Sequence, residues 1–156
     1  MNIVCGNNYR RKEQKMIKVS FYESADDRLL KFAVIAARHN GKWVFCKHKQ
    51  RKTWELPGGH REAGEDILTA AKRELYEETG AVKFDIEPVC VYSVTEENAA
   101  DKKETFGMLY YAQISEFEPE LRNEIEKIIV SDELPSDWTY PEIQPGLLER
   151  AAEYCG

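Results

Sequence analysis

The clearest periodic pattern in the chain lies between Asp66 and Gly80. Small and apolar residues recur there at spacings of three and four, which predicts an α-helix with one buried stripe. Asp66 is the candidate N-cap, because its short carboxylate can accept hydrogen bonds from the free amides of the first turn. Gly80 is the candidate end, because glycine adopts the left-handed conformation that terminates helices. The predicted buried stripe consists of Leu68, Ala71, Leu75 and Thr79.

Alternating and apolar runs on either side of this helix predict β-strands. In chain order these strands are residues 16–22, 29–37, 42–47, 86–95, 106–114 and 127–130. Asn40-Gly41 separates the second strand from the third and favours a type I′ hairpin turn. Pro145 lies in the first turn of a predicted closing helix, residues 144–155. The pattern supports an α+β or α/β domain over residues 16–156, preceded by an N-terminal extension, residues 1–15.

The central helix also carries a row of acids. Glu74 lies three residues before Glu77 and four before Glu78, so the three carboxylates project from one side of the helix. Like charges at this spacing repel each other by roughly 0.2–0.5 kcal/mol per pair. A hard divalent cation would remove this penalty, because it takes oxygen ligands and can bridge carboxylates and substrate phosphates. The alternative is a solvated acidic face, with Arg73 paired to Glu77.

The spacing of the residues around these acids resembles the signature of the Nudix hydrolase family. That signature reads glycine–x5–Glu–x7–Arg-Glu-aliphatic-x-Glu-Glu-x-Gly-aliphatic. The matching positions are Gly59, Glu65, Arg73, Glu74, Leu75, Glu77, Glu78 and Gly80. Ala81 departs from the pattern, because the family usually carries a larger aliphatic residue there, and Val82 follows it. We call residues 58–81 the signature segment.

The resemblance implies the Nudix fold, an α/β/α sandwich around a mixed β-sheet. It also implies metal-dependent hydrolysis of a nucleoside diphosphate linked to another group. The implied ligands of Mg²⁺ or Mn²⁺ are the Gly58 carbonyl, Glu74, Glu77 and Glu78. The general base is either Glu74 or an acid outside the signature. Arg73 is expected to orient the carboxylates by pairing with a neighbour such as Glu65.

An additional acid from a downstream loop often joins the metal site in this family. Glu124 and Glu126 are the candidates, because they precede the short strand predicted at residues 127–130. A solvated acidic stretch is the alternative for both.

A basic cluster, residues 47–52, directly precedes the glycine turn at Gly58-Gly59. Lys47, Lys49 and Arg51 are therefore candidates for phosphate contact, although a solvated loop would look the same. Gly59 permits a close approach of the backbone to a ligand. Trp138 and Tyr140 are candidates for stacking on a base, or for core positions. For His60, a hydrogen-bonding loop position is favoured over metal ligation.

Composition narrows the class of protein. A length of 156 residues suits one domain, and a net charge of −6 argues against a nucleic-acid polymer as partner. The four cysteines form no C-x-x-C pair, so zinc and redox roles are disfavoured and a reduced, cytoplasmic protein is expected. No apolar run approaches the ~20 residues that cross a bilayer, so no membrane partner is expected. A monomer or homodimer is expected.

The small size and the Trp-Glu-Leu-Pro-Gly-Gly lead-in look like MutT-like members of the family. These hydrolyse nucleoside triphosphates, including oxidised purine nucleotides, to a monophosphate and pyrophosphate. The alternatives are a hydrolase of ADP-ribose, nucleotide sugars or dinucleoside polyphosphates, and a non-catalytic nucleotide-binding module. The retained acids argue against the last, because a pure binder gains nothing from like charges in repulsion.

Overall fold

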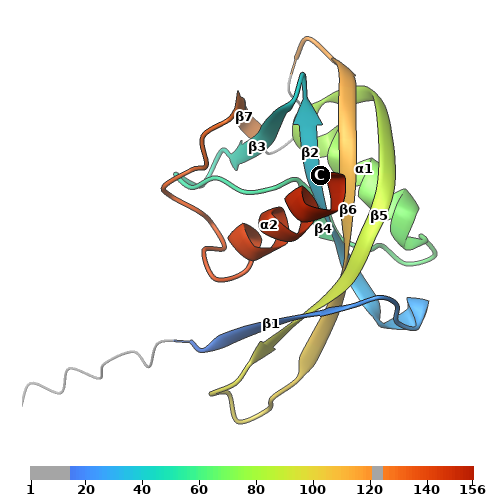
Figure 1. The fold of residues 1–156 in the computed structure, drawn as a ribbon, viewed down its shortest axis with the longest axis vertical. Helices are drawn as coiled ribbons and strands as arrows, with labels where there is room; N and C mark the ends of the chain where they lie inside the picture. The colour runs from blue at the N-terminus through green and yellow to red at the C-terminus, as the bar shows by residue number, and fades with distance from the viewer. Residues whose placement is uncertain (1–14, 121–124) are drawn as a thin grey trace, which may run out of the picture.

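The computed structural model describes residues 15–120 and 125–156, and gives Glu126 by its backbone alone. The predicted extension, residues 1–15, therefore lies outside the described residues except for Lys15. In chain order the elements are β1 (Ile17–Tyr22), the 3-10 turn η1 (Asp27–Leu29), β2 (Leu30–His39), β3 (Lys42–His48), β4 (Gly58–His60), α1 (Ile67–Thr79), β5 (Ala81–Glu96), β6 (Glu104–Phe117), β7 (Ile125–Ser131) and α2 (Gln144–Cys155). Figure 1 shows one twisted sheet with a helix on each side.

The sheet is mixed, as expected. It has seven strands. Six of them lie side by side in the order β1-β5-β6-β2-β3-β7, and the short strand β4 pairs with β2 outside this order. The β2–β6 pair is parallel and the other pairs are antiparallel. Asn40 and Gly41, which connect β2 to β3, have φ values of 50° and 79°, as the predicted type I′ turn requires.

Alternate residues of β2 face the two helices. Ala33 and Ile35 belong to the core cluster that contains Ala71 and Leu75 of α1. Val34 and Ala36 belong to the cluster on the other face, which contains Leu147, Leu148 and Ala151 of α2. Because side chains alternate between the faces of a strand, the two helices cover opposite faces. The α/β/α sandwich is confirmed.

Helix α1 has the predicted ends. Oδ1 of Asp66 accepts a hydrogen bond from the Thr69 amide at 2.7 Å, and Gly80 takes φ 77° at the C-terminus. The predicted stripe was wrong at Leu68, which is 39% exposed. Ile67 takes its place, because it lies four residues before Ala71 and thus on the inner face. The buried residues of the helix are Ile67, Ala70, Ala71, Leu75, Glu78 and Thr79.

Strands β5 and β6 are longer than predicted. β5 begins at Ala81, directly after the helix, and the loop expected over residues 96–104 shrinks to residues 97–103. Pairing between β5 and β6 shifts register near Pro88, which has no amide hydrogen to donate. Their far ends, with β1, form a ribbon that projects from the body of the domain (Figure 1). Among the described residues, no helix is long and apolar enough to cross a membrane.

Candidate active site

The glycine turn lies against helix α1. Within β4, Gly58 pairs with Val34 and Gly59 with Ala33. A Cβ added at Gly59 would come within 3.0 Å of the Glu74 carboxylate, and one added at Gly58 would meet the Ala33 carbonyl equally closely. Gly58 therefore requires glycine because the clash is with backbone, whereas a side chain at Gly59 would displace the Glu74 carboxylate. The role of Gly59 seen here is to make room for Glu74, and its predicted contact with substrate stays a prediction.

Arg73 organises the acids of the signature segment. Its Nε and Nη2 donate to the two carboxylate oxygens of Glu65 at 2.8 and 2.9 Å, which is the pairing that was expected. Its Nη1 donates to Glu74 at 2.9 Å and to Glu77 at 3.2 Å. The hydrogen bonding from Arg73 is the main cause that lowers the pKa of Glu65 to about 2. One guanidinium thus fixes three carboxylates in one arrangement.

Five glutamates line a cleft of about 650 Å³ beside the helix, which we call the acidic cleft. They are Glu55, Glu62, Glu74, Glu77 and Glu78. The side chains of Glu55 and Glu78 are only 8% and 7% exposed, whereas that of Glu77 is 40% exposed. Burial, together with the nearby charge of Glu78, raises the pKa of Glu74 to about 7. The cleft therefore concentrates more negative charge than its surroundings neutralise.

His48, at the end of β3, is a residue that the sequence did not single out. Its Nε2 lies 2.9 Å from Oε1 of Glu55 and 2.9 Å from Oε2 of Glu78. Its pKa is raised, first by the hydrogen bond to Glu78 and then by the charge of Glu55, against the effect of burial. Glu55 was also missed, although it stands three residues before Gly58. Strand alternation could have placed His48 on the side of β3 that carries the buried Cys46.

This donor set fits a divalent cation. One ligand atom each from His48, Glu55 and Glu78 lies within 4.8 Å of the others. Carboxylate oxygens suit Mg²⁺, and an imidazole nitrogen beside them suits transition ions such as Mn²⁺. The Gly58 amide donates to Oε1 of Glu78 at 2.9 Å, which fixes the orientation of that carboxylate. The predicted ligands Glu74, Glu77 and Glu78 thus share one cleft with Gly58.

The downstream acids are placed only in part. Glu124 lies outside the described residues, as does the side chain of Glu126. The backbone of Glu126 belongs to β7, where its neighbour Ile125 pairs with His48 and lines the acidic cleft. The strand therefore reaches the site, and ligation by either acid stays a prediction.

The basic cluster divides into residues at the cleft and residues beside it. Arg51 lines the acidic cleft, and its Nη1 donates to Glu55 at 3.2 Å and to the Tyr140 hydroxyl at 3.4 Å. Lys47 donates to the Arg51 carbonyl at 3.1 Å, and Lys49 is exposed. Neither lysine is among the described residues that line the cleft. Of the three predicted phosphate contacts in this cluster, Arg51 is thus the one that the structure brings to the acids, beside His48.

A second hollow, of about 380 Å³, opens next to the acidic cleft, and we call it the apolar cavity. Its apolar lining comes from Phe32, Val34, Leu56, Tyr92, Val94 and Ile143. Glu55, Gly58 and Tyr140 line both hollows, so the two meet at the glycine turn. Trp138 is not among the described lining residues of either one. It packs edge-on against Phe45, with ring centroids 5.5 Å apart, in the core cluster under α2.

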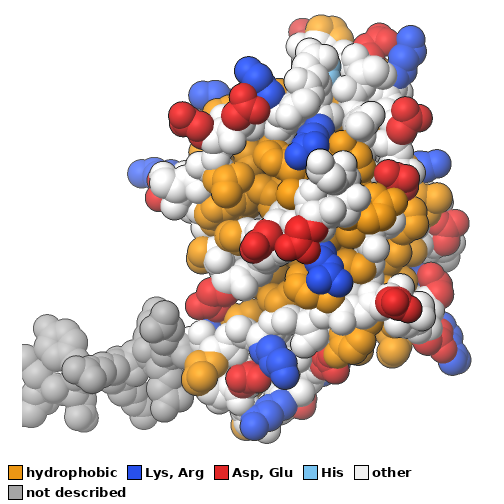
Figure 2. Space-filling view, in the orientation of Figure 1, with side chains coloured by type: hydrophobic (Ala, Val, Ile, Leu, Met, Phe, Trp, Pro, Cys, Tyr) orange, Lys and Arg blue, Asp and Glu red, His pale blue; other side chains and the backbone are white. Residues whose placement is uncertain are grey.

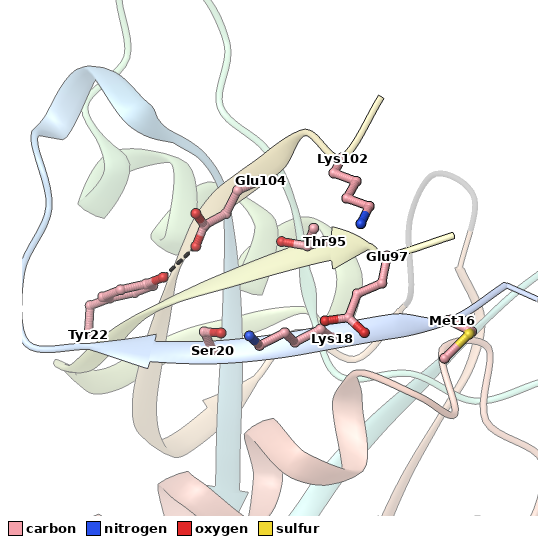
Figure 3. A pocket seen from close by; sticks show the side chains of 8 residues that line it. All are labelled: Met16, Lys18, Ser20, Tyr22, Thr95, Glu97, Lys102 and Glu104. Atoms are coloured by element: carbon pink, nitrogen blue, oxygen red, sulfur yellow. Dashed lines mark hydrogen bonds between the residues drawn. The ribbon is translucent and has the colours of Figure 1, made fainter. Parts of the chain in front are cut away.

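A further hollow of about 480 Å³ lies between β1 and the β5–β6 ribbon (Figure 3). Tyr22 donates a hydrogen bond to Glu104, which also accepts from the Ser93 hydroxyl at 2.6 Å. Lys18 and Lys102 lie beside Glu97 and Glu104 here, so the charges are mixed. None of the predicted site residues lines this hollow.

Comparison with known proteins decides the family. A sequence model of the NUDIX domain matches residues 27–146, which span strands β2 to β7, the signature segment and the start of α2. The chain belongs to the Nudix hydrolase family. The signature segment, which brings Arg73, Glu74, Glu77 and Glu78 to the acidic cleft, lies within the matched residues.

Two curated relatives have names that bear on nucleotide chemistry. The putative 8-oxo-dGTP diphosphatase YtkD of Bacillus subtilis is 30% identical over 105 residues, which cover 67% of this chain and 63% of YtkD. An RNA pyrophosphohydrolase of Bartonella henselae is 43% identical over 56 residues, covering 30% of this chain and 32% of that enzyme. Both matches span less than two thirds of the relative's length.

Among solved structures, the chain is similar to the Bacillus subtilis pyrophosphohydrolase BsRppH. The TM-score is 0.72 at 25% identity, and the match covers 90% of this chain and 92% of that one. The similarity therefore extends over most of both chains.

Proposed function

We propose that this chain hydrolyses a nucleoside triphosphate to a nucleoside monophosphate and pyrophosphate, with Mg²⁺ or Mn²⁺ as cofactor. The observation that carries the proposal is the junction of the acidic cleft with the apolar cavity at Glu55, Gly58 and Tyr140. Polyphosphate needs cations and a polar channel, whereas a nucleobase needs an apolar slot. The two hollows offer both, side by side.

The residues of the acidic cleft have separate tasks in this reaction. A divalent cation, when bound, would neutralise phosphate charge and activate water. Glu74, Glu77 and Glu78 would hold it, joined by Glu55 and His48, while Arg73 and Glu65 position the carboxylates. Water attacks a phosphorus atom, the bond to the leaving oxygen breaks, and an acid accepts the water's proton. Glu74 and, outside the signature, Glu55 are the acids placed to accept it.

A purine base is the substrate group that we propose for the apolar cavity. A volume of about 380 Å³ falls in the range of small-ligand pockets, and Phe32 and Tyr92 supply aromatic lining. The name of YtkD, a putative 8-oxo-dGTP diphosphatase, supports an oxidised guanine nucleotide as one substrate. Tyr140 at the junction, and Arg51, which donates to its hydroxyl from the acidic cleft, are our candidates for contact with the sugar and phosphates.

A second candidate is removal of pyrophosphate from the 5′ end of RNA. It is favoured by the similarity to the RNA pyrophosphohydrolase of Bartonella henselae. The net charge of −6 and the scattered Lys and Arg side chains on the face seen in Figure 2 disfavour contact with a long polymer. On this alternative, the chain would hold the terminal nucleotide in the same two hollows.

The test is a substrate panel assayed with and without Mg²⁺. It contains dGTP, 8-oxo-dGTP, dATP, ADP-ribose, a diadenosine polyphosphate, a nucleotide sugar and a 5′-triphosphorylated oligoribonucleotide. We expect metal-dependent release of pyrophosphate from the free triphosphates to be fastest, and ¹⁸O-labelled water to show which phosphorus is attacked. The substrate assignment would be overturned if one of three substrates were turned over far faster than every free nucleoside triphosphate. These three are ADP-ribose, the diadenosine polyphosphate and the oligonucleotide.

We also propose a cytoplasmic location and a monomer or homodimer. Cys46, Cys90 and Cys155 are free thiols, which suits a reducing compartment. Fractionation and light scattering would test the location and the assembly.

A further inference from the structure

Strand β1 forms one edge of the sheet, with β5 on one side and no strand among the described residues on the other (Figure 1). The Met16 carbonyl accepts a hydrogen bond from the Glu97 amide at 2.8 Å, so Met16 directs its carbonyl toward β5. In an antiparallel ladder this direction alternates from one residue to the next. The amides and carbonyls of Ile17, Val19 and Phe21 therefore point away from β5, toward the open side.

This open edge lacks the features that commonly block further strand pairing. Proteins protect such edges with proline, a β-bulge or several charges. β1 contains no proline, and it pairs with β5 without a shift in register. Its one charged residue, Lys18, lies with Ser20 and Tyr22 on the face that Figure 3 shows. On the other face, Val19 and Phe21 pack against the core cluster that contains α2 residues. The edge can therefore accept another strand.

The charges that flank β1 are arranged symmetrically about Val19. Lys15 lies four residues before Val19 and Glu23 lies four residues after it, and both are exposed. The Lys15 ammonium lies 3.9 Å from the Glu96 carboxylate, with its side chain 72% exposed. Glu23 has no ion-pair partner among the described residues. An antiparallel pair of β1 strands with Val19 opposite Val19 would place Lys15 of each copy opposite Glu23 of the other.

We propose that β1 pairs antiparallel with β1 of a second copy of this chain, about a two-fold axis at Val19. The outward-facing backbone groups of the two strands then bond to each other, with Ile17 opposite Phe21 and Val19 opposite Val19. Oppositely charged side chains face each other at both ends of the paired segment. This inference goes beyond the proposed reaction and does not depend on its substrate.

The neighbouring registers are less favourable. Outward-facing residues must lie opposite one another to exchange hydrogen bonds, so the alternatives differ by steps of two residues. One step in one direction places Lys18 opposite Lys18, and like charges directly opposite are destabilising. One step in the other direction places Ile17 opposite Glu23 and removes both ion pairs. The register centred on Val19 is the one that avoids both losses.

A hollow beside the strand would receive part of the second copy. It has a volume of about 580 Å³, is lined in part by Phe21, Arg150 and Tyr154, and leaves Tyr154 47% exposed. Ile17 of the second copy would lie opposite Phe21, at this hollow. A six-residue strand is much smaller than a standard interface of 20–30 residues a side, so we expect a dissociation constant above about 1 µM.

A charge exchange tests the pairing by sedimentation equilibrium between about 1 µM and 1 mM protein. We expect wild type to dimerise, and Lys15→Glu or Glu23→Lys alone to weaken the dimer by about tenfold or more. Each change puts like charges opposite each other at two symmetry-related places. The double variant restores the attraction with the signs exchanged and should dimerise as wild type does. Lys72→Glu is the matched control, because it changes the net charge equally at an exposed position of α1.

Disulfide crosslinking tests the register. Val19→Cys places two thiols opposite each other with their Cα atoms about 5.5 Å apart, which a disulfide can span. Ser20→Cys is the control, because the two Ser20 positions lie diagonally at roughly 7–8 Å. We expect crosslinked dimer on mild oxidation of Val19→Cys and little from Ser20→Cys.

Three outcomes would overturn the proposal. They are a monomer at every concentration, a dimer that Lys15→Glu weakens no more than Lys72→Glu does, and crosslinking through Ser20→Cys in place of Val19→Cys. None of these residues lines the acidic cleft, so the failure of this pairing and the failure of triphosphate hydrolysis are distinguishable.

Discussion

Nε2 of His48 lies 2.9 Å from Oε2 of Glu78, so the end of β3 and the last turn of α1 meet in the acidic cleft. The same nitrogen lies 2.9 Å from Glu55. Protonated His48 thus supplies positive charge where a divalent cation would otherwise be needed. The stability of the metal-free protein should depend on this proton.

The first prediction is that metal-free protein loses stability as the pH rises from about 5 to 8. The pKa of His48 is raised, so its stabilisation is complete below about 6.5 and is lost as pH rises through the folded-state pKa. The pKa of Glu74 is about 7 in the fold, so Glu74 also binds a proton that the unfolded chain releases from about pH 4.5 upward. Both groups act in the same direction.

Denaturant unfolding at several pH values measures this dependence. Mg²⁺ at pH 8 should restore stability, and Glu74→Gln should flatten the slope between pH 5 and 7. Glu149→Gln, at an exposed position of α2 outside the acidic cleft, is the control and should leave the slope unchanged. If the metal-free protein were equally stable at pH 6 and pH 8, the protons on His48 and Glu74 would not stabilise the fold as we infer.

The second prediction concerns the close contact of Gly59 with Glu74. In Gly59→Ala, the new methyl group would displace the Glu74 carboxylate from its bond to Arg73. We expect the affinity for Mn²⁺ to fall about tenfold or more, measured by calorimetry or by the electron paramagnetic resonance of free Mn²⁺. Gly146→Ala is the control, because no atom lies within 4 Å of the added Cβ there. Unchanged Mn²⁺ binding in Gly59→Ala would show that Glu74 does not need its present position.

The helix could be predicted from the sequence because its signals are local. Asp66 and Gly80 mark its ends by their own backbone chemistry, and the register of Glu74, Glu77 and Glu78 follows from helical geometry. The prediction for Leu68 was wrong because Ile67 and Leu68 are both apolar, and periodicity alone does not tell which of the two lies on the inner face. The choice depends on the sheet against which the helix packs.

His48 and Gln144, which lines the apolar cavity, could not be found in the same way. Each meets a segment distant in sequence, His48 at Glu78 and Gln144 at Leu56 across 88 positions. Such contacts depend on strand order, which a single sequence does not reveal. The same limit applies to Trp138, whose aromatic ring suggested stacking but packs against Phe45.

The third prediction separates the charge of Arg73 from its shape. Arg73→Lys keeps the charge but cannot bond both oxygens of Glu65 while also reaching Glu74. We expect kcat to fall by about a hundredfold, since misplaced catalytic groups commonly cost that much, with a smaller change in KM. Arg61→Lys is the control, because Arg61 pairs with Asp27 outside the acidic cleft. If the kcat of Arg73→Lys equalled that of wild type, the hydrogen bonds from the guanidinium to Glu65 and Glu74 would not be needed for catalysis.

The fourth prediction divides the basic cluster by position. Arg51 lines the acidic cleft and contacts Tyr140, whereas Lys49 is exposed and is not among the described lining residues. Arg51→Gln should raise KM for nucleoside triphosphates by about tenfold, the loss expected when one charge-assisted hydrogen bond to phosphate is removed. The effect on ADP-ribose should be smaller, because that molecule has no terminal phosphate to hold. Lys49→Gln removes the same charge nearby and should change KM less than twofold, as expected for an exposed charge. If the two variants weaken triphosphate binding equally, the contribution of this cluster is a general attraction, and contact between Arg51 and the phosphates is excluded.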